Sequence, residues 1–235
     1  MAKDSPDIAG AVSLLTERVK SLLETHVPPH SRGRILIALS GVPGSGKSTI
    51  SSALLRALPS HGIDNVIVLP MDGFHYTTDE LKKFEDPVTA FRRRGAPFTF
   101  DSERFLGMLS KLKELPVTTG DEPEFTLLAP SFDHAVKNPV EDSIAISSRT
   151  RVVIVEGNYT LLDDDPWRQI ANIVDDRWFI DVNPQVALER LVTRHIQAGI
   201  ETSRDAAVAR ALENDIPNGD MIRSKLIEPT IRIIN

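Results

Sequence analysis

The segment Gly-Val-Pro-Gly-Ser-Gly-Lys-Ser at residues 41–48 has the spacing of a phosphate-binding loop. Its glycines allow the backbone to curl, so that successive N–H groups point inward at phosphate oxygens. Lys47 would reach the β- and γ-phosphates of a nucleotide, and the Ser48 hydroxyl would hold Mg²⁺. The residues predicted to contact the nucleotide are Gly41, Val42, Pro43, Gly44, Ser45, Gly46, Lys47, Ser48 and Thr49.

Carboxylates follow two other apolar segments. Asp72 comes shortly after the segment 66–69, and Glu156 follows directly after the segment 151–155. In an open α/β sheet, ligands bind beyond the carboxyl ends of the strands. Asp72 would accept the proton of an attacking hydroxyl group, with a helix cap or a Mg²⁺ ligand as alternatives. Glu156 would order Mg²⁺ or hold an acceptor molecule, or else face solvent.

Two sets of arginines supply positive charge. Arg190 and Arg194 are four residues apart, so they share one face of a predicted helix. They predict a lid that closes over the nucleotide and neutralises charge on a transferring phosphoryl group, with a solvated surface pair as the alternative. The run 92–94 is either a solvated face or a face turned toward an anion. We interpret His195 as structural.

These side chains need strands and helices to position them. Short apolar runs bounded by turn residues predict buried strands at 34–40, 66–69, 151–155, 177–182 and 230–234. Helical spacing and capping residues predict helices at 8–23, 49–58, 102–115, 167–174, 184–198 and 205–214, with a shorter one at 81–84. The stretch 84–100 is expected to be irregular, and short β-like pieces occur at 124–128 and 144–146. Because strands and helices alternate, the fold class is predicted to be α/β with a parallel sheet.

The chain has no internal repeat and no change of composition that would mark a linker. We therefore expect one domain over residues 1–235. Within it, we expect an acceptor-binding insertion over 74–148 and a lid region over 190–220.

The composition excludes several classes of function. The 235 residues contain 27 Lys and Arg against 33 Asp and Glu, and the net charge of −6 disfavours a nucleic-acid partner. The sequence contains no Cys, which excludes disulfides, thiolate metal sites and a Cys nucleophile. No apolar run approaches the roughly 20 residues that cross a membrane, so we expect a cytoplasmic protein. Phosphate binding must then depend on backbone dipoles and a few local cations.

The order of these motifs resembles the phosphoribulokinase/uridine kinase family of P-loop kinases over roughly residues 34–200. Within that family, the chain is most similar to pantothenate kinases and to uncharacterised fructose-kinase-like proteins. The resemblance depends on Asp72-Gly73-Phe74, on the segment 94–101, and on Pro-Ser-Phe-Asp-His at 130–134. Pantothenate kinases have similar segments, with Tyr at the position of Phe132.

The resemblance implies an enzyme that transfers the γ-phosphate of ATP to a hydroxyl group of a pantothenate-, nucleoside- or sugar-like metabolite. It implies ATP and Mg²⁺ as cofactors. It also implies a three-layer α/β/α fold, in which a five-stranded parallel sheet has the strand order 2-3-1-4-5 and is accompanied by a small acceptor-binding insertion and a helical lid. The implied catalytic residues are Asp72, Lys47, Arg190 and Arg194. The residues implied to contact the acceptor are Asp72, His75, Tyr76, Arg94, Asp101, Asp133, His134 and Glu156. Ser48 and Glu156 would hold the metal.

Other functions make different demands on the sequence. The main alternative is a nucleotide-binding ATPase or regulatory protein without a small-molecule acceptor, which would leave Asp72, Asp101 and His134 without a purpose. A GTPase switch would need an Asn-Lys-x-Asp segment to recognise guanine, and the sequence has none. A homodimer is compatible with the sequence, which does not specify the acceptor.

Overall fold

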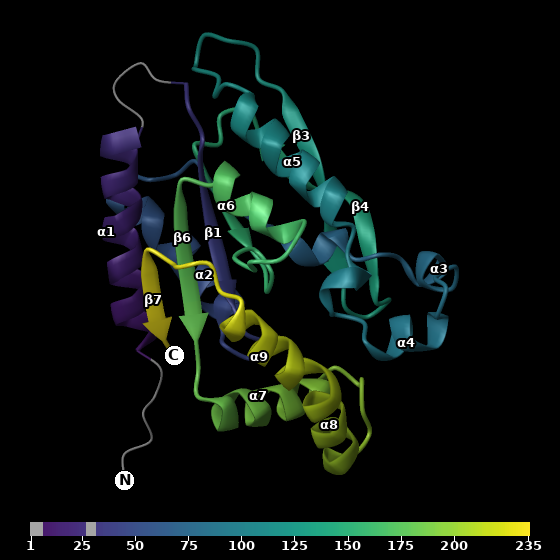
Figure 1. Cartoon of the computed structure of the whole chain (residues 1–235). Helices are drawn as coiled ribbons and strands as arrows, with labels where there is room; N and C mark the ends of the chain where they lie inside the picture. The colour runs from purple at the N-terminus through teal and green to yellow at the C-terminus, as the bar shows by residue number, and fades with distance from the viewer. Residues whose placement is uncertain (1–6, 27–31) are drawn as a thin grey trace.

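A parallel sheet of five strands forms the centre of the molecule in the computed structural model, which describes residues 7–26 and 32–235 (Figure 1). The strands of this sheet are β1 (Ile35–Gly41), β2 (Val66–Pro70), β5 (Val152–Glu156), β6 (Asp176–Asp181) and β7 (Ile231–Ile234). They lie in the order β2-β5-β1-β6-β7. Counted in chain order within this sheet, the order is the predicted 2-3-1-4-5, because β3 and β4 form a separate sheet.

Helices cover both faces of the sheet, so the predicted three layers are confirmed. On one face, α1 (Ile8–His26) and α2 (Lys47–Ala57) pack through Leu15 and Leu54 against Ile37 of β1. On the other face, α5 (Ser102–Glu114) and α6 (Ile170–Ile173) pack through Phe105 and Ile170 in the core that contains Leu36. Neighbouring residues of a strand point to opposite faces. Because both faces are covered, every residue of β1 is buried and the strand is apolar nearly throughout.

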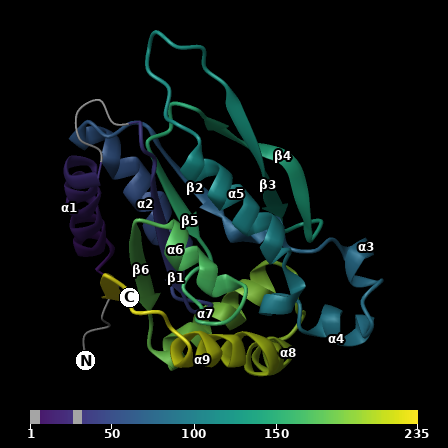
Figure 2. The same cartoon turned by 45° about the horizontal axis from the view of Figure 1, so that its top comes forward.

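A second group of elements lies to one side of the sheet (Figures 1 and 2). It contains an antiparallel hairpin, β3 (Thr126–Asp133) and β4 (Asn138–Ser147), together with α3 (Thr78–Leu81), α4 (Pro87–Arg92) and the 3₁₀ turn η3 (Pro97–Thr99). The hairpin packs against η2 (Met71–Phe74), the 3₁₀ turn that follows β2. Pro130 of β3 and Gly73 of η2 approach so closely that a Cβ on Gly73 would lie 2.1 Å from the Pro130 carbonyl oxygen.

Helices of the C-terminal part lie beyond the carboxyl ends of β6 and β7 (Figure 1). They are α7 (Pro184–Gln197), α8 (Arg204–Arg210), the π-helical turn η5 (Ala211–Asp215) and α9 (Ile216–Ser224). The remaining short elements are η1 (Leu58–His61) and η4 (Trp167–Gln169). Among the described residues, no helix combines the length and the apolar character needed to cross a bilayer.

Several predicted element boundaries were wrong. The stretch 84–100 is not wholly irregular, because the Asp86 carboxylate accepts a hydrogen bond from the Thr89 N–H at 3.0 Å and so begins α4. The short helix predicted at 81–84 lies at 78–81 instead. The helix α9 was not predicted, because Pro217 and Gly219 are poor helix formers. Pro217 is tolerated because it lies in the first turn of the helix.

Candidate active site

The phosphate-binding loop joins β1 to the beginning of α2, as the motif requires. Gly44 and Gly46 have φ angles of +78° and +89°, in the left-handed region that favours glycine. The Ser45 hydroxyl is buried and has no hydrogen-bond partner among the described residues. The first N–H groups of α2 have no partner within the helix, so they are free to bind an anion. The loop therefore offers donors that suit a phosphate group.

Lys47, the first residue of α2, is buried beneath this loop. Its Nζ donates hydrogen bonds to the Gly41 carbonyl oxygen at 2.9 Å and to Asn158 Oδ1 at 2.7 Å. Burial lowers the pKa of Lys47 to about 8, although Glu156 and Asp72 favour its charged form. A nucleotide phosphate near this ammonium group would favour the charged form further, so the site is suited to an anionic ligand.

Glu156 is the last residue of β5 and lies between two other strand ends. It pairs with Leu39 of β1 on one side and with Pro70 of β2 on the other. Its carboxylate accepts hydrogen bonds from Ser48 Oγ at 2.6 Å and from Ser51 Oγ at 2.8 Å. The structure therefore brings together the two residues predicted to hold a metal ion, and it does not leave Glu156 as an isolated solvent-facing acid.

A Mg²⁺ ion at Ser48 and Glu156 would need further oxygen ligands. Among residues 7–26 and 32–235, no three His, Asp or Glu side chains are grouped so that they could hold a metal by themselves. Mg²⁺ is commonly bound through one or two protein ligands together with substrate phosphates and water. The donor set fits that mode of binding, and the nucleotide would complete it.

Asp72 lies just beyond β2, in the turn η2. Because β2 neighbours β5, Asp72 and Glu156 lie at adjacent strand ends. The Asp72 side chain caps no helix, since Thr77 caps the following helix α3. Its backbone carbonyl oxygen lies 2.9 Å from Nδ1 of His75. The half-buried carboxylate is thus available to a ligand, as a proton acceptor must be.

Aromatic rings surround the side of the site next to Asp72. The His75 ring lies 3.8 Å from the Phe100 ring and 4.8 Å from the Phe132 ring, measured between centroids. The His134 ring lies 5.1 Å from that of Phe132, and the Arg94 guanidinium group lies 5.5 Å from the centre of the same ring. Burial lowers the pKa of His75, which favours the neutral form of this imidazole. We name the five residues His75, Arg94, Phe100, Phe132 and His134 the aromatic cluster.

The other residues predicted to contact an acceptor bond to the protein itself. The Tyr76 carbonyl oxygen accepts a hydrogen bond from Arg94 at 2.9 Å. The Asp101 carboxylate caps α5, and Asp133 Oδ1 accepts hydrogen bonds from two backbone N–H groups in the turn of the β3–β4 hairpin. These contacts shape the walls around the aromatic cluster. A direct contact of Asp101 or Asp133 with an acceptor stays a prediction.

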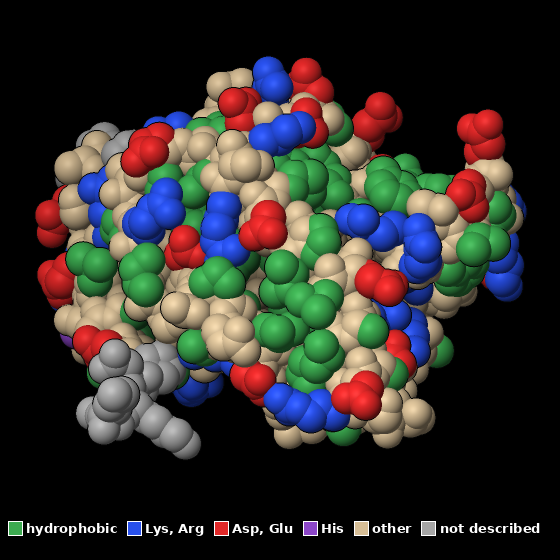
Figure 3. Space-filling view, turned by 60° about the horizontal axis from the view of Figure 1, so that its bottom comes forward, with side chains coloured by type: hydrophobic (Ala, Val, Ile, Leu, Met, Phe, Trp, Pro, Cys, Tyr) green, Lys and Arg blue, Asp and Glu red, His purple; other side chains and the backbone are tan. Residues whose placement is uncertain are grey.

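The two arginines of the predicted lid lie on α7 and face different groups. Arg190 Nη1 donates a hydrogen bond to the Gly44 carbonyl oxygen at 3.2 Å. Arg194 is exposed, with Nη2 4.0 Å from an Asp215 carboxylate oxygen. His195 is buried, and its Nε2 lies 3.2 Å from the other oxygen of Asp215, so it braces α7 against η5. Acidic and basic side chains are interspersed over the face of the molecule shown in Figure 3.

Three residues near the loop were not predicted from the sequence. Asn158 holds Lys47, and Ser51 holds the second oxygen of Glu156. Asn235 follows β7, and its Nδ2 donates a hydrogen bond to the Ser45 carbonyl oxygen at 2.5 Å. Ser51 lies one helical turn after Ser48, a spacing that could have been recognised. Asn158 and Asn235 carry no local signal, because their contacts depend on the order of the strands.

The family model described as "Phosphoribulokinase / Uridine kinase family" matches residues 36–208. The Schizosaccharomyces pombe protein C227.14, whose name assigns it provisionally as a uridine kinase, is 35% identical over 229 residues, which cover 97% of this chain and 92% of that protein. The crystal structure of YFH7 from Saccharomyces cerevisiae has a TM-score of 0.83 at 25% identity, covering 95% of this chain and 99% of that one. A structure from Silicibacter sp. TM1040, described provisionally as a fructose transport system kinase, has a TM-score of 0.77 at 34% identity and covers 94% and 98%.

Proposed function

The chain belongs to the phosphoribulokinase/uridine kinase family of P-loop kinases, and we propose that it transfers the γ-phosphate of ATP to a hydroxyl group of a small metabolite. The observation that carries this proposal is the convergence of Lys47, Glu156 and Asp72 near the carboxyl ends of β1, β5 and β2, which are neighbouring strands. Lys47 serves the phosphates, Glu156 the metal and Asp72 the acceptor. The acceptor is pantothenate-, nucleoside- or sugar-like.

The nucleotide binds along the loop 41–49. Backbone N–H groups and the unpartnered Ser45 hydroxyl donate to its phosphate oxygens, and Lys47 neutralises charge on the β- and γ-phosphates. Ser48 and Glu156 would hold a Mg²⁺ ion, which would supply further charge neutralisation when bound. Asn158 fixes the position of the Lys47 ammonium group before the nucleotide arrives.

The acceptor binds between Asp72 and the aromatic cluster. Asp72 takes the proton of the acceptor hydroxyl, whose oxygen forms the new bond to the γ-phosphorus, while the bond from that phosphorus to the β,γ-bridging oxygen breaks and ADP leaves. Neutral His75 and the rings of Phe100 and Phe132 provide an apolar wall. The remaining walls come from the residues predicted to contact the acceptor, namely Tyr76, Arg94, Asp101, Asp133, His134 and Glu156.

The lid region 190–220 closes over the nucleotide. Arg190 already contacts the loop through Gly44, and exposed Arg194 is free to move inward and neutralise charge on the transferring phosphoryl group. Closure also excludes water, which would otherwise compete with the acceptor for the phosphoryl group. In this proposal the chain acts as one kinase domain, in which residues 74–148 form the acceptor-binding insertion. The enzyme is proposed to be cytoplasmic.

Release of ADP in the presence of candidate acceptors tests this proposal. We expect at least one metabolite from a panel of pantothenate, nucleosides, sugars and glycerate to stimulate ADP release. Asp72→Asn should reduce turnover of that metabolite by about 10²–10⁴-fold. Asp79→Asn, which changes an exposed carboxylate of α3 that pairs with Lys82, is the matched control and should have no effect. Unchanged turnover in Asp72→Asn would refute the assignment of the base. ATP hydrolysis that no metabolite stimulates would favour an ATPase without a small acceptor.

A further inference from the structure

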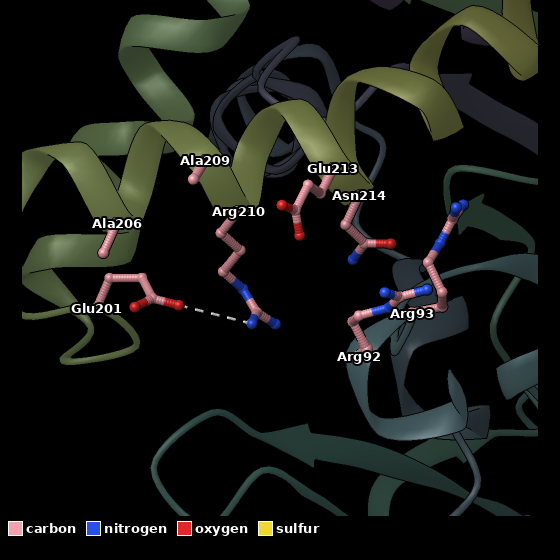
Figure 4. A pocket seen from close by; sticks show the side chains of 8 residues that line it. All are labelled: Arg92, Arg93, Glu201, Ala206, Ala209, Arg210, Glu213 and Asn214. Atoms are coloured by element: carbon pink, nitrogen blue, oxygen red, sulfur yellow. Dashed lines mark ion pairs between the residues drawn. The ribbon is translucent and has the colours of Figure 1, made fainter. Parts of the chain in front are cut away.

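A cavity of about 410 Å³ lies between α4 and the segment formed by α8 and η5 (Figure 4). Its volume is within the range of roughly 300–1,000 Å³ that is typical of small-molecule sites. Arg92 and Arg93 line it from α4 and the turn that follows this helix, and Arg210 lines it from α8 on the other side. The cavity is thus built by the predicted acceptor-binding insertion together with the predicted lid.

The arginines on the α4 side of this cavity lack a close ion pair within the part of the chain that the structure describes. Among the described residues, no carboxylate lies within 4 Å of a charged nitrogen of Arg92 or Arg93. Arg93 is half-buried, and its Nη2 donates to Asn218 Oδ1 at 3.1 Å. Its Nε is buried and has no hydrogen-bond partner among residues 7–26 and 32–235. A half-buried guanidinium group with unused donors is costly unless an acceptor satisfies it. Its planar fork matches a carboxylate or a phosphate.

Two glutamates also line the cavity, and they do not cancel this charge. Glu201 lies 3.7 Å from Arg210, so this pair is internally compensated. Glu213 is exposed, where its charge is well solvated and screened. The lining of the cavity thus contains three arginines against two glutamates. Arg210 can exchange its glutamate partner for an anion.

The cavity is linked to the aromatic cluster through the short segment 93–95. Arg93 borders the cavity and its guanidinium group donates to Asn218, whereas the next residue, Arg94, faces Phe132 of the cluster. Asn214, which also lines the cavity, donates a hydrogen bond from Nδ2 to the Arg94 carbonyl oxygen at 3.0 Å. The segment 93–95 therefore connects the wall of the cavity to the wall of the aromatic cluster.

We propose that the acceptor of this kinase carries an anionic group, either a carboxylate or a phosphate, which Arg92, Arg93 and Arg210 bind in this cavity. The inference rests on the proposed function and narrows it. It favours an acidic or phosphorylated acceptor over a neutral nucleoside or a neutral sugar. Specificity for an anionic over a neutral acceptor arises because a neutral analogue leaves donors of the Arg93 guanidinium group without a hydrogen-bond acceptor.

Matched pairs of compounds test the inference. The pairs are pantothenate with pantothenol, glycerate with glycerol, fructose 6-phosphate with fructose, and uridine 5′-monophosphate with uridine. We expect an anionic member to have a kcat/KM at least about tenfold above that of its neutral partner, the least gain expected from one charge-assisted hydrogen bond. The first two pairs test a carboxylate, and the last two test a phosphate. If a neutral member is phosphorylated at least as well as its anionic partner in every active pair, the inference is wrong.

Arg93→Gln tests the role of the cavity directly. We expect it to raise KM for the anionic acceptor by about 10- to 100-fold, the cost of a lost charge-assisted contact, and to leave KM for ATP unchanged. Arg93→Lys should recover part of this loss, because it retains the charge without the fork. Arg204→Gln is the matched control, since Arg204 is exposed on α8, pairs with Glu189 and does not line the cavity. An unchanged KM for the acceptor in Arg93→Gln would overturn the inference.

A binding measurement decides the matter even if no compound of the panel is phosphorylated. Thermal unfolding is recorded with ADP and Mg²⁺ present, so that the phosphate-binding loop is already filled. We expect an anionic compound to raise Tm more than its neutral partner in the wild type, and this difference to disappear in Arg93→Gln. Equal shifts within every pair, or a difference that survives in Arg93→Gln, would overturn the inference. Failure of the proposed function has a separate signature, which is that ADP and ATP themselves produce no rise in Tm.

Discussion

Gly73→Ala is the substitution that most directly tests how the predicted acceptor-binding insertion is held against Asp72, the proposed catalytic carboxylate. Gly73 follows Asp72 in η2, and a Cβ at this position would lie 2.1 Å from the Pro130 carbonyl oxygen and 2.6 Å from the Pro130 carbonyl carbon. Both atoms belong to the backbone of β3, so neither can rotate away as the end of a side chain could. The β3–β4 hairpin must therefore move away from η2 by roughly 1 Å to restore an ordinary contact.

The size of the effect follows from this displacement. Inserting a methyl group into a packed contact costs about 1–3 kcal/mol. At about 2–4 °C per kcal/mol for a chain of this size, Tm should fall by roughly 2–12 °C. A displacement of about 1 Å between the acceptor and Asp72 can lower kcat/KM by about 100-fold. Pro130 belongs to β3 and the phosphate-binding loop to the segment 41–49, so the affinity for ADP should be unchanged.

The assay combines thermal unfolding, ADP binding and turnover of the acceptor, with Gly107→Ala as the matched control. A Cβ on Gly107 meets nothing within 4 Å, and this glycine lies inside the helix α5. The same substitution should therefore stabilise the protein there by about 0.5–1 kcal/mol. The reasoning is refuted if Gly73→Ala retains wild-type Tm and turnover, or if it weakens ADP binding as much as it weakens turnover.

Three further predictions concern single side chains. Asp176→Asn should destabilise the protein by about 2–4 kcal/mol in urea unfolding, because the buried Asp176 carboxylate accepts hydrogen bonds from Arg18. Burial opposes ionisation of Asp176, but the hydrogen bonds to its carboxylate outweigh burial and lower its pKa below 3.8. The difference in free energy of unfolding between Asp176→Asn and the wild type should therefore persist above about pH 4 and diminish as the pH falls below that value. Glu156→Gln should raise the Mg²⁺ concentration needed for half-maximal ATP binding by about 10- to 100-fold, because it removes a carboxylate that would order the metal ion. A titration of ATP binding with Mg²⁺ measures this change. Tyr159→Phe should lower Tm by roughly 2–6 °C in a thermal scan, because it removes the buried hydroxyl that donates to the Gly95 carbonyl oxygen at 2.5 Å.

The parts of the site that the sequence predicted are those that depend on consecutive residues or on strand ends. The phosphate-binding loop is defined by neighbouring residues, so its strand–loop–helix context can be recognised from the order of the amino acids alone. Asp72 and Glu156 could be placed together because the carboxyl ends of parallel strands meet at one edge. The central sheet was predicted for the same kind of reason, since buried strands are short apolar runs between turn residues.

The parts that could not be predicted depend on contacts between distant residues. Asn158 bonds to Lys47 across 111 positions, and nothing in its neighbours indicates this. Arg93 and Arg210 line one cavity only because α4 and the segment formed by α8 and η5 fold against each other. The run 92–94 by itself therefore does not distinguish a solvated face from an anion-binding face. Its position next to α8 favours the second interpretation.

The distribution of ion pairs bears on the proposal that this acidic protein binds acidic ligands. With a net charge of −6, the average field of the chain repels nucleotides and acidic metabolites. Exposed cations such as Arg204 are paired with carboxylates, and such pairs add little field beyond a Debye length of about 8–10 Å. Lys47 and Arg93, in contrast, donate only to neutral oxygens among the contacts that the described residues make. Both cations are partly shielded from water, so their positive potential acts at short range on a ligand inside the site. Raising the ionic strength should therefore weaken acceptor binding much less than Arg93→Gln does, and a salt titration of KM distinguishes this local attraction from long-range steering.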